Sequence, residues 1–170
     1  MEGSRSWSRV LAIVGSVAMV IGAIDPLEGS VIILVGSGLV AFGAFLGRGE
    51  RRLFAYRLWV FVLIAIGVGA LWGLSAVGGF GGQARSVWWG MLVLPYVIGW
   101  LMGICGPGSP RWLLWLGIGV GLWYVTILAM VLSKAFARPG MSAVPAVVIA
   151  CIGVLTIGAC IYRLRKRTTG

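Results

Sequence analysis

The sequence predicts an all-helical membrane protein, a compact glycine-rich bundle of six transmembrane helices with both termini in the cytoplasm. Hydrophobic residues make up 60% of the 170 residues and charged residues only 11%, whereas soluble domains carry about 25% charged residues. The mean hydropathy is +1.04. Apolar runs long enough to cross a bilayer, about 20 residues each, recur along the chain. We therefore expect a single integral membrane domain over residues 1–170, with the lipid bilayer as its main partner.

Six apolar runs define the expected helices in chain order. We predict spans over residues 8–24, 26–46, 57–78, 87–105, 111–133 and 143–162. The first run follows Arg5 and Arg9, as the core of a secretory signal would. No small-residue cleavage motif follows it, so we expect this run to stay in the protein as a helix.

The basic residues predict the orientation of these helices. Cytoplasmic loops of membrane proteins carry an excess of Lys and Arg. Eleven bases fall on the side of the termini, namely Arg5, Arg9, Arg48, Arg51, Arg52, Arg57, Arg111, Arg163, Arg165, Lys166 and Arg167. Three fall on the other side, namely Arg85, Lys134 and Arg138. We therefore expect a multi-pass protein of the plasma (bacterial inner) membrane, with both termini cytoplasmic.

Tryptophans support the same orientation. Indole rings prefer the membrane interface because they combine an apolar body with one polar donor. The predicted cytoplasmic helix ends carry Trp7, Trp59, Trp112 and Trp115, and an outer end carries Trp88 and Trp89.

An acidic turn, IDPLEG, joins the first two predicted spans and holds two of the four acidic residues. With Asp25 as N-cap and Pro26 at the first helical position, Glu28 falls at the third, which is a variant of the capping box. Asp25 and Glu28 could instead form an ion or proton site, because ionisable groups at membrane depth often mark function. We favour the cap.

Glycine pairs spaced four apart predict close helix packing. Such pairs let helix backbones approach in a bilayer, where lipid offers no hydrophobic drive for association. The pairs within spans are Gly43/Gly47, Gly69/Gly73, Gly99/Gly103 and Gly117/Gly121. In the fourth predicted span, Pro95 removes one backbone hydrogen bond, so we expect a kink there.

The basic C-terminal segment predicts contact with anionic lipid at the cytoplasmic face. Each Lys or Arg near such a surface contributes about 1 kcal/mol. The residues are Arg163, Arg165, Lys166 and Arg167. Simple anchoring by positive charge is the alternative, and we favour it. The net charge of +10 does not indicate nucleic-acid binding, because the bases cluster at the ends of apolar runs and no soluble segment could form such a domain.

The sequence offers little chemistry for catalysis. The chain has no histidine, the commonest metal ligand and general base. No zinc, nucleotide-binding or hydrolase motif occurs in the context it needs. We expect no enzyme activity, no catalytic residues, no metal and no cofactor.

Two functional hypotheses remain. The first is a structural or accessory subunit that packs with copies of itself or with other membrane subunits. The second is a small ion or solute transporter or channel that uses Asp25 and Glu28. We favour the first, because few polar residues lie within the predicted spans to line a path through the membrane.

Overall fold

The computed structural model describes residues 2–24, 28–47, 51–77, 92, 94–136 and 144–168. Within these ranges only the backbone is described at residues 2–5, 128, 131–136, 144–149 and 167–168. The regular elements of this part of the chain are all helices, and the prediction of an all-helical fold is confirmed for it. They are α1 (Glu2–Gly22), α2 (Gly29–Leu46), α3 (Arg51–Ala76), α4 (Leu94–Cys105), α5 (Arg111–Phe136) and α6 (Val144–Thr168).

Four helices extend beyond the apolar runs that predict them: α1 and α3 begin earlier, and α5 and α6 end later. α3 begins at Arg51 rather than at residue 57, since the six residues between include no glycine or proline and favour a helix. α6 continues through the basic segment RLRKRT for the same reason. α4 ends where the sequence predicts, and the part of the predicted span upstream of residue 94 lies outside the described residues except for Leu92.

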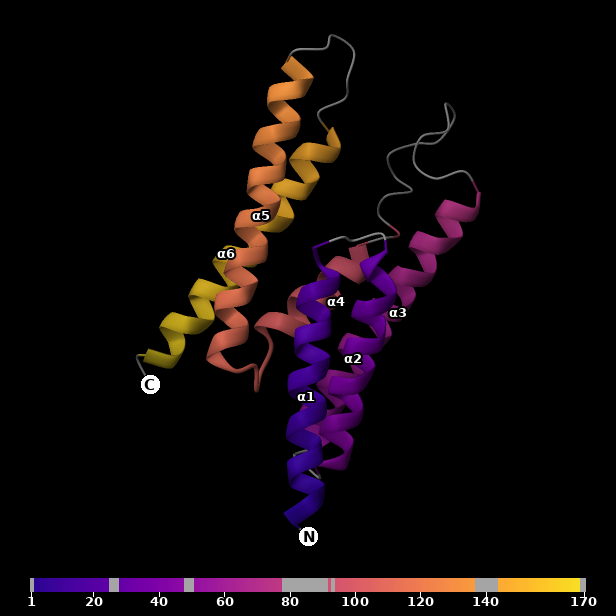
Figure 1. The fold of residues 1–170 in the computed structure, drawn as a ribbon, viewed down its shortest axis with the longest axis vertical. Coiled ribbons are helices and arrows are strands. Elements are labelled where there is room, and N and C mark those ends of the chain that lie inside the picture. Colours follow the sequence, from indigo (N-terminus) through magenta and orange to yellow (C-terminus); the bar gives the residue numbers. More distant parts are fainter. Residues whose placement is uncertain are drawn as a thin grey trace. The chain divides into compact units, whose positions relative to one another are not determined.

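The chain divides into two compact units, residues 1–108 and residues 109–170. The first unit holds α1 to α4 (Figure 1). α1 packs against α2, α2 against α3, α3 against α4, and α4 touches α1, so that the four helices share one core. A single membrane domain formed by both units stays a prediction.

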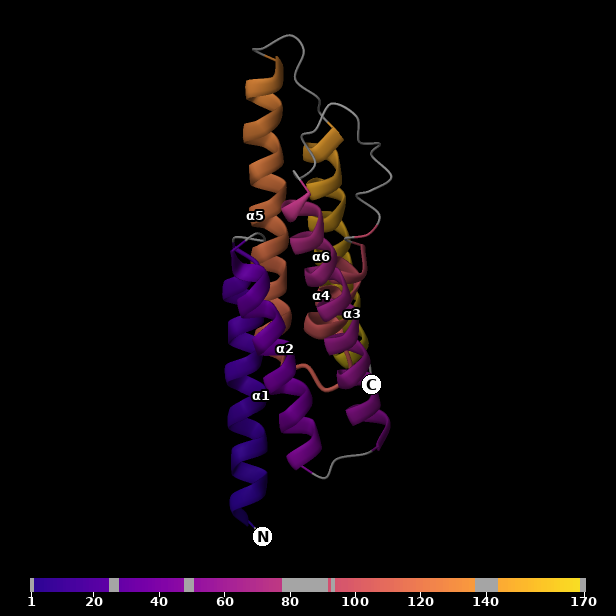
Figure 2. The same cartoon turned by 90° about the vertical axis from the view of Figure 1, so that its right-hand side faces the viewer.

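The α1–α2 pair, antiparallel in Figure 2, is built on small residues spaced seven apart. Ser8, Gly15 and Gly22 of α1 lie opposite Gly43, Gly36 and Gly29 of α2. A methyl group added to Gly36 would lie 2.6 Å from the carbonyl oxygen of Gly15, and one added to Gly43 would lie 2.9 Å from that of Ser8. The Ser8 hydroxyl donates a 2.6 Å hydrogen bond to the Gly43 carbonyl. We call these six residues the α1–α2 seam; any larger side chain would push the two backbones apart.

The core of the first unit lies where its helices meet. Among its most deeply buried side chains are Met19, Ile33, Ile64 and Ile104. Glycines of α4 let that helix lie close to α3. A methyl group on Gly99 would lie 3.0 Å from the Cβ of Leu63, and one on Gly103 would lie 3.3 Å from a methyl of Val60. The antiparallel α3–α4 pair is therefore closely packed along one side of α4.

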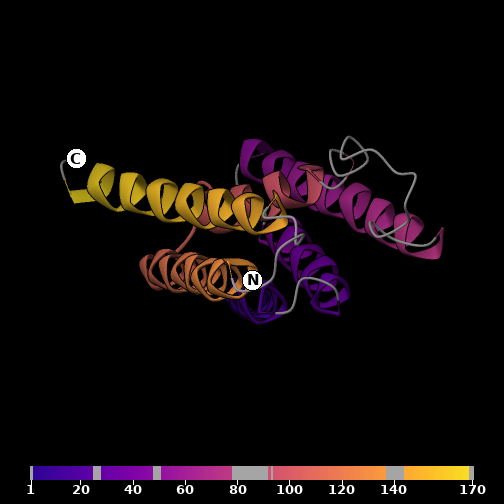
Figure 3. The same ribbon diagram turned by 90° about the horizontal axis from the view of Figure 1, so that it is seen from above.

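The second unit is the antiparallel hairpin of α5 and α6, which lie side by side in Figures 1 and 3. Gly121 and Gly153 lie opposite each other. A methyl group on Gly121 would lie 2.8 Å from the carbonyl oxygen of Gly153, and one on Gly153 would lie 2.7 Å from that of Gly121. This close approach fixes which residues of the two helices are level with each other.

Within the part of the chain that the structure describes, two helices, α2 and α3, are long and apolar enough to cross a membrane. Shorter apolar stretches occupy Ser6–Gly22, Leu94–Cys105 and Arg111–Ile127. Large apolar side chains are exposed on both candidate spans, among them Phe42, Phe45, Trp59, Ile66 and Trp72. The prediction of helices suited to a membrane therefore holds for α2 and α3, and a bundle of six spans stays a prediction.

Candidate functional site

The acidic turn between α1 and α2 differs from the capping box that the sequence predicts. α2 begins at Gly29, so Glu28 stands at the N-cap (φ −75°, ψ −35°) and not at the third helical position. The Glu28 side chain is exposed and makes no hydrogen bond that caps the helix. Asp25 and Pro26 lie outside the described residues. The ion or proton site that the sequence offers as the alternative stays a prediction.

The late start of α2 follows from the glycines on either side of the turn. A methyl group on Gly22 would lie 2.6 Å from the carbonyl oxygen of Gly29, so the two helices are in backbone contact up to this end. The N–H groups of Ala23 and Ile24 bond to carbonyls three residues earlier, at 3.2 and 3.1 Å, which tightens the end of α1. This contact between Gly22 and Gly29 holds the start of α2 level with the end of α1.

Most of the predicted packing glycines lie against neighbouring helices. A methyl group would meet α1 from Gly43 and Gly47, α3 from Gly99 and Gly103, and α6 from Gly121. Gly117 is buried. The structure thus brings Gly43, Gly47, Gly99, Gly103 and Gly121 to helix–helix contacts within the two units.

The predicted pair on α3 lies in open space. A methyl group added to Gly69 or Gly73 would have no atom within 4 Å. Both glycines are exposed, and Ile66, which lies on the same side of the helix, is 56% exposed. We call these three residues the open α3 face. It is a small-residue surface on one of the two helices suited to crossing a membrane.

A cluster that the sequence analysis missed joins α3 to the end of α4. Arg57, counted above among loop residues, is only 8% exposed. Its Nη1 donates to the Gly103 carbonyl at 3.2 Å and its Nη2 to the Pro107 carbonyl at 3.1 Å. The Tyr56 hydroxyl donates to the Met102 carbonyl at 2.8 Å. The last carbonyls of a helix lack partners and carry partial negative charge, so Arg57 and Tyr56 cap α4 from outside.

In the sequence, the position of Arg57 within an apolar run indicates this cluster. In RRLFAYRLWV, Arg51 and Arg52 stand together at the start of α3, whereas Arg57 is flanked by Tyr56 and Leu58. A lone base inside an apolar helical run needs a partner. Which partner it finds depends on the pairing of α3 with α4, which no local pattern gives.

A second missed contact ties α4 to α1. Trp100 is 4% exposed, and its indole N–H donates to the Met19 carbonyl at 3.0 Å. Met19 lies in the last turn of α1, next to the turn that the Ala23 N–H closes to the Val20 carbonyl. The indole of Trp100 therefore joins α4 to the last turn of α1.

Pro95 and the basic segment lie at helix ends. Pro95 is the second residue of α4, in its first turn, where proline is tolerated. The kink predicted there stays a prediction, because residues 91 and 93 lie outside the described part. At the end of α6, Arg165 and Lys166 are exposed and Arg163 is half-buried. The side chain of Arg167 lies outside the described residues.

The buried polar side chains of the described helices are hydrogen-bonded. Besides the contacts above, the Trp72 indole donates to the Ser30 hydroxyl at 3.4 Å, and the Thr156 hydroxyl to the Ile152 carbonyl at 2.7 Å. Among the described residues no buried side-chain nitrogen or oxygen lacks a hydrogen-bond partner. In the same part of the chain no three His, Cys, Asp or Glu side chains form a group that could hold a metal ion.

Comparisons of the chain with protein-family models, with curated proteins and with solved structures found no match. The function proposed below therefore rests on the residues and contacts described above.

Proposed function

We propose that this protein is a non-enzymatic integral membrane protein, a structural or accessory subunit that packs with copies of itself or with other membrane subunits. The open α3 face carries the proposal. Gly69 and Gly73 present a small-residue surface to the outside of an apolar helix. In lipid, helices associate through close van der Waals packing, for which such surfaces are suited.

The rest of the molecule supports this use of the open α3 face. Glycines lie at close backbone contacts in both units, as at Gly15 with Gly36 and at Gly121 with Gly153. The protein therefore uses glycine as its means of helix packing. The open α3 face offers the same chemistry to a helix from another subunit.

The membrane placement that we propose has six spans, with both termini in the bacterial cytoplasm. Its support is the length and apolar character of α2 and α3, the exposed apolar side chains and the excess of bases near the termini. A reporter active only in the cytoplasm should work when fused after residue 170. A reporter active only outside should work when inserted near residue 81. The opposite result at either position would contradict the topology.

Native mass measurement in mild detergent tests the assembly. The wild-type protein should extract as a homo-oligomer or with a second membrane protein bound. The double variant Gly69→Leu/Gly73→Leu should be monomeric, because two bulky side chains would separate the helices. Compared monomer with monomer, its thermal unfolding should not fall below that of the wild type, because a Cβ at either site meets no atom within 4 Å and leucine favours a helix over glycine.

A matched control uses glycines of the other unit. Gly119 and Gly158 also have no atom within 4 Å, so Gly119→Leu/Gly158→Leu makes the same change elsewhere on the surface. This control should keep the assembly. A monomeric wild type, or equal loss of assembly in both double variants, would contradict the role of the open α3 face.

Transport is the second candidate function, and one observation favours it. Glu28 is exposed at the N-cap of α2, where a solute at the acidic turn could reach its side chain. In liposomes, flux lost in both Asp25→Asn and Glu28→Gln, with folding intact, would favour transport. If the wild-type protein shows no flux, transport is contradicted and the structural role is the function that remains.

A further inference from the structure

The pairing of α5 with α6 brings basic residues of two distant segments to one end of the hairpin. Gly121 lies opposite Gly153 in antiparallel helices. Arg111 is ten residues before Gly121, and Arg163 is ten residues after Gly153. At 1.5 Å per residue, both lie about 15 Å from the closest approach and in the same direction. Figure 1 shows the start of α5 and the end of α6 at the same end of this unit.

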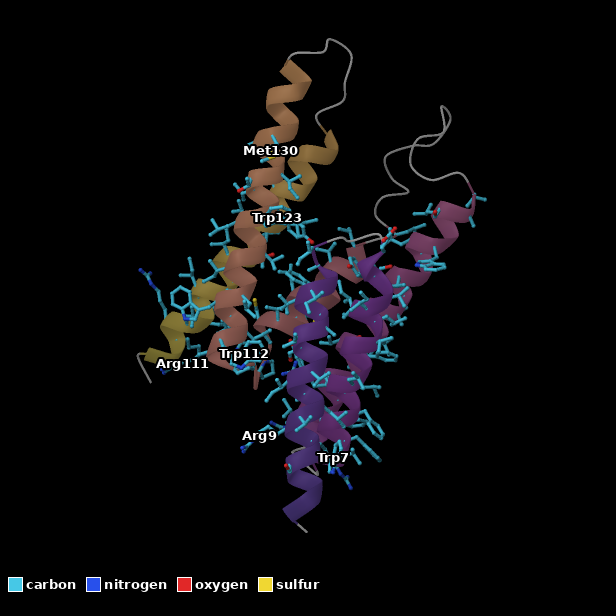
Figure 4. The ribbon with its side chains drawn as sticks, in the orientation of Figure 1. Trp7, Arg9, Arg111, Trp112, Trp123 and Met130 are labelled. Carbon is cyan, nitrogen blue, oxygen red and sulfur yellow. The ribbon has the colours of Figure 1, made fainter. Side chains whose placement is uncertain are left out.

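This end of the hairpin carries four described bases from two helices. Arg111, labelled in Figure 4, is exposed at the first position of α5. Arg163, Arg165 and Lys166 lie in the last turns of α6. The sequence alone groups only the α6 residues, since Arg111 is far away in the chain. We call Arg111, Arg163, Arg165 and Lys166 the basic end.

Exposed aromatic and apolar side chains lie next to the basic end. Trp115 is 64% exposed, one helical turn after Arg111. Tyr162, one turn before Lys166, is 65% exposed. Amphipathic rings of this kind are favoured at the level of the lipid headgroups. The surface therefore changes from charged to apolar within about one helical turn.

No acidic side chain in this unit balances the charge. Residues 109–170 contain no aspartate and no glutamate, but seven bases, namely Arg111, Lys134, Arg138, Arg163, Arg165, Lys166 and Arg167. Like charges held together repel each other. Anionic groups outside this unit would relieve that repulsion, and phosphate oxygens match the donors of arginine in geometry and charge.

We propose that the basic end binds the phosphates of anionic lipid headgroups, with the acyl chains lying along the apolar surface beside Trp115 and Tyr162. The adjoining apolar surface favours a lipid over free phosphate as the source of the anion. This inference rests on the membrane placement proposed above and adds to it a lipid class and the residues from two helices that bind it.

The test compares reconstitution in phosphatidylcholine with reconstitution in mixtures of phosphatidylcholine and phosphatidylglycerol, and measures lipid retention by native mass spectrometry. Wild-type protein should retain phosphatidylglycerol preferentially. Arg111→Gln/Arg165→Gln, at two exposed positions, should weaken retention about fivefold per residue and about 25-fold together. Arg111→Lys/Arg165→Lys should keep most of it, because the charge remains.

Lys134→Gln/Arg138→Gln is the matched control, since it removes the same number of charges from the side that the sequence predicts to be the outer one. An equal loss in this control would mean diffuse attraction and overturn the proposal. Competition by inorganic phosphate as strong as by the lipid would also overturn it. Wild-type protein that inserts into bilayers without preferring phosphatidylglycerol contradicts this inference alone, whereas failure to insert contradicts the membrane placement.

Discussion

The α1–α2 seam and the open α3 face contain the same kind of residue in opposite surroundings. At the seam, added methyl groups on Gly36 and Gly43 would lie 2.6 and 2.9 Å from backbone oxygens of α1. On the open α3 face, methyl groups on Gly69 and Gly73 would meet nothing within 4 Å. The α2 side of the seam and the open α3 face both lie on helices long and apolar enough to cross a membrane. The difference shows that glycine in an apolar helix marks a possible contact, and that the contact itself depends on the partner.

The largest predicted effect comes from breaking the seam. Gly36→Val should lower the free energy of unfolding by about 3 kcal/mol, because the added carbons would collide with the backbone of Gly15 and could be accommodated only by moving α1 away. Chemical denaturation in mild detergent measures the change. Gly69→Val, the same substitution on the open α3 face, should leave the unfolding of the monomer nearly unchanged. Equal destabilisation by both would remove the distinction between the two surfaces.

The next prediction concerns α3. Near its start, Arg57 is hydrogen-bonded to carbonyls at the end of α4, whereas Gly69 and Gly73 further along face no other atoms. Arg57→Met should lower the free energy of unfolding by about 2–3 kcal/mol, because two charge-assisted hydrogen bonds to the end of α4 are lost. Arg57→Lys should recover only part of this, since an ammonium group does not have the geometry of the guanidinium fork. Thermal unfolding in detergent checks both variants. An unaffected Arg57→Met protein would contradict the assigned cap.

A smaller effect is expected when the Ser8 hydroxyl of the α1–α2 seam is removed. Ser8→Ala should cost about 1 kcal/mol, because the hydrogen bond from Ser8 to the Gly43 carbonyl joins two helices. Thr126→Ala is the control: its hydroxyl bonds at 2.9 Å to Leu122 within the same exposed stretch of α5. It should change stability by less than about 0.5 kcal/mol. Equal costs in denaturant titrations would show that the Ser8 bond adds nothing between helices.

The smallest effect is expected on the open α3 face. Gly69→Ala should leave the isolated monomer unchanged or stabilise it by up to about 1 kcal/mol, because alanine favours a helix over glycine and no atom stands in its way. The melting temperature of the monomer in detergent measures this. A clear destabilisation would reveal a neighbouring group against Gly69.

The all-helical fold was predictable because apolar runs of about 20 residues specify helices locally. The predictions from isolated residues were less successful. Glu28 was expected at the third position of α2 and stands at its N-cap, because the approach of Gly22 to Gly29 sets where the turn fits. The α1–α2 seam was not predicted, because its small residues recur every seven residues, whereas the predicted glycine pairs are spaced by four. Arg57 was missed because its partner carbonyls belong to α4.

The sequence by itself determined the helical composition, the apolar surface and the distribution of charge, since these depend on residue type and on spacing within one segment. The tertiary structure decided which glycines are contacts and which are open, where Arg57 and Trp100 find their acceptors, and that Arg111 shares an end with Arg163. These features depend on how two helices are aligned against each other. That alignment is a property of the packed pair and cannot be read from either helix alone.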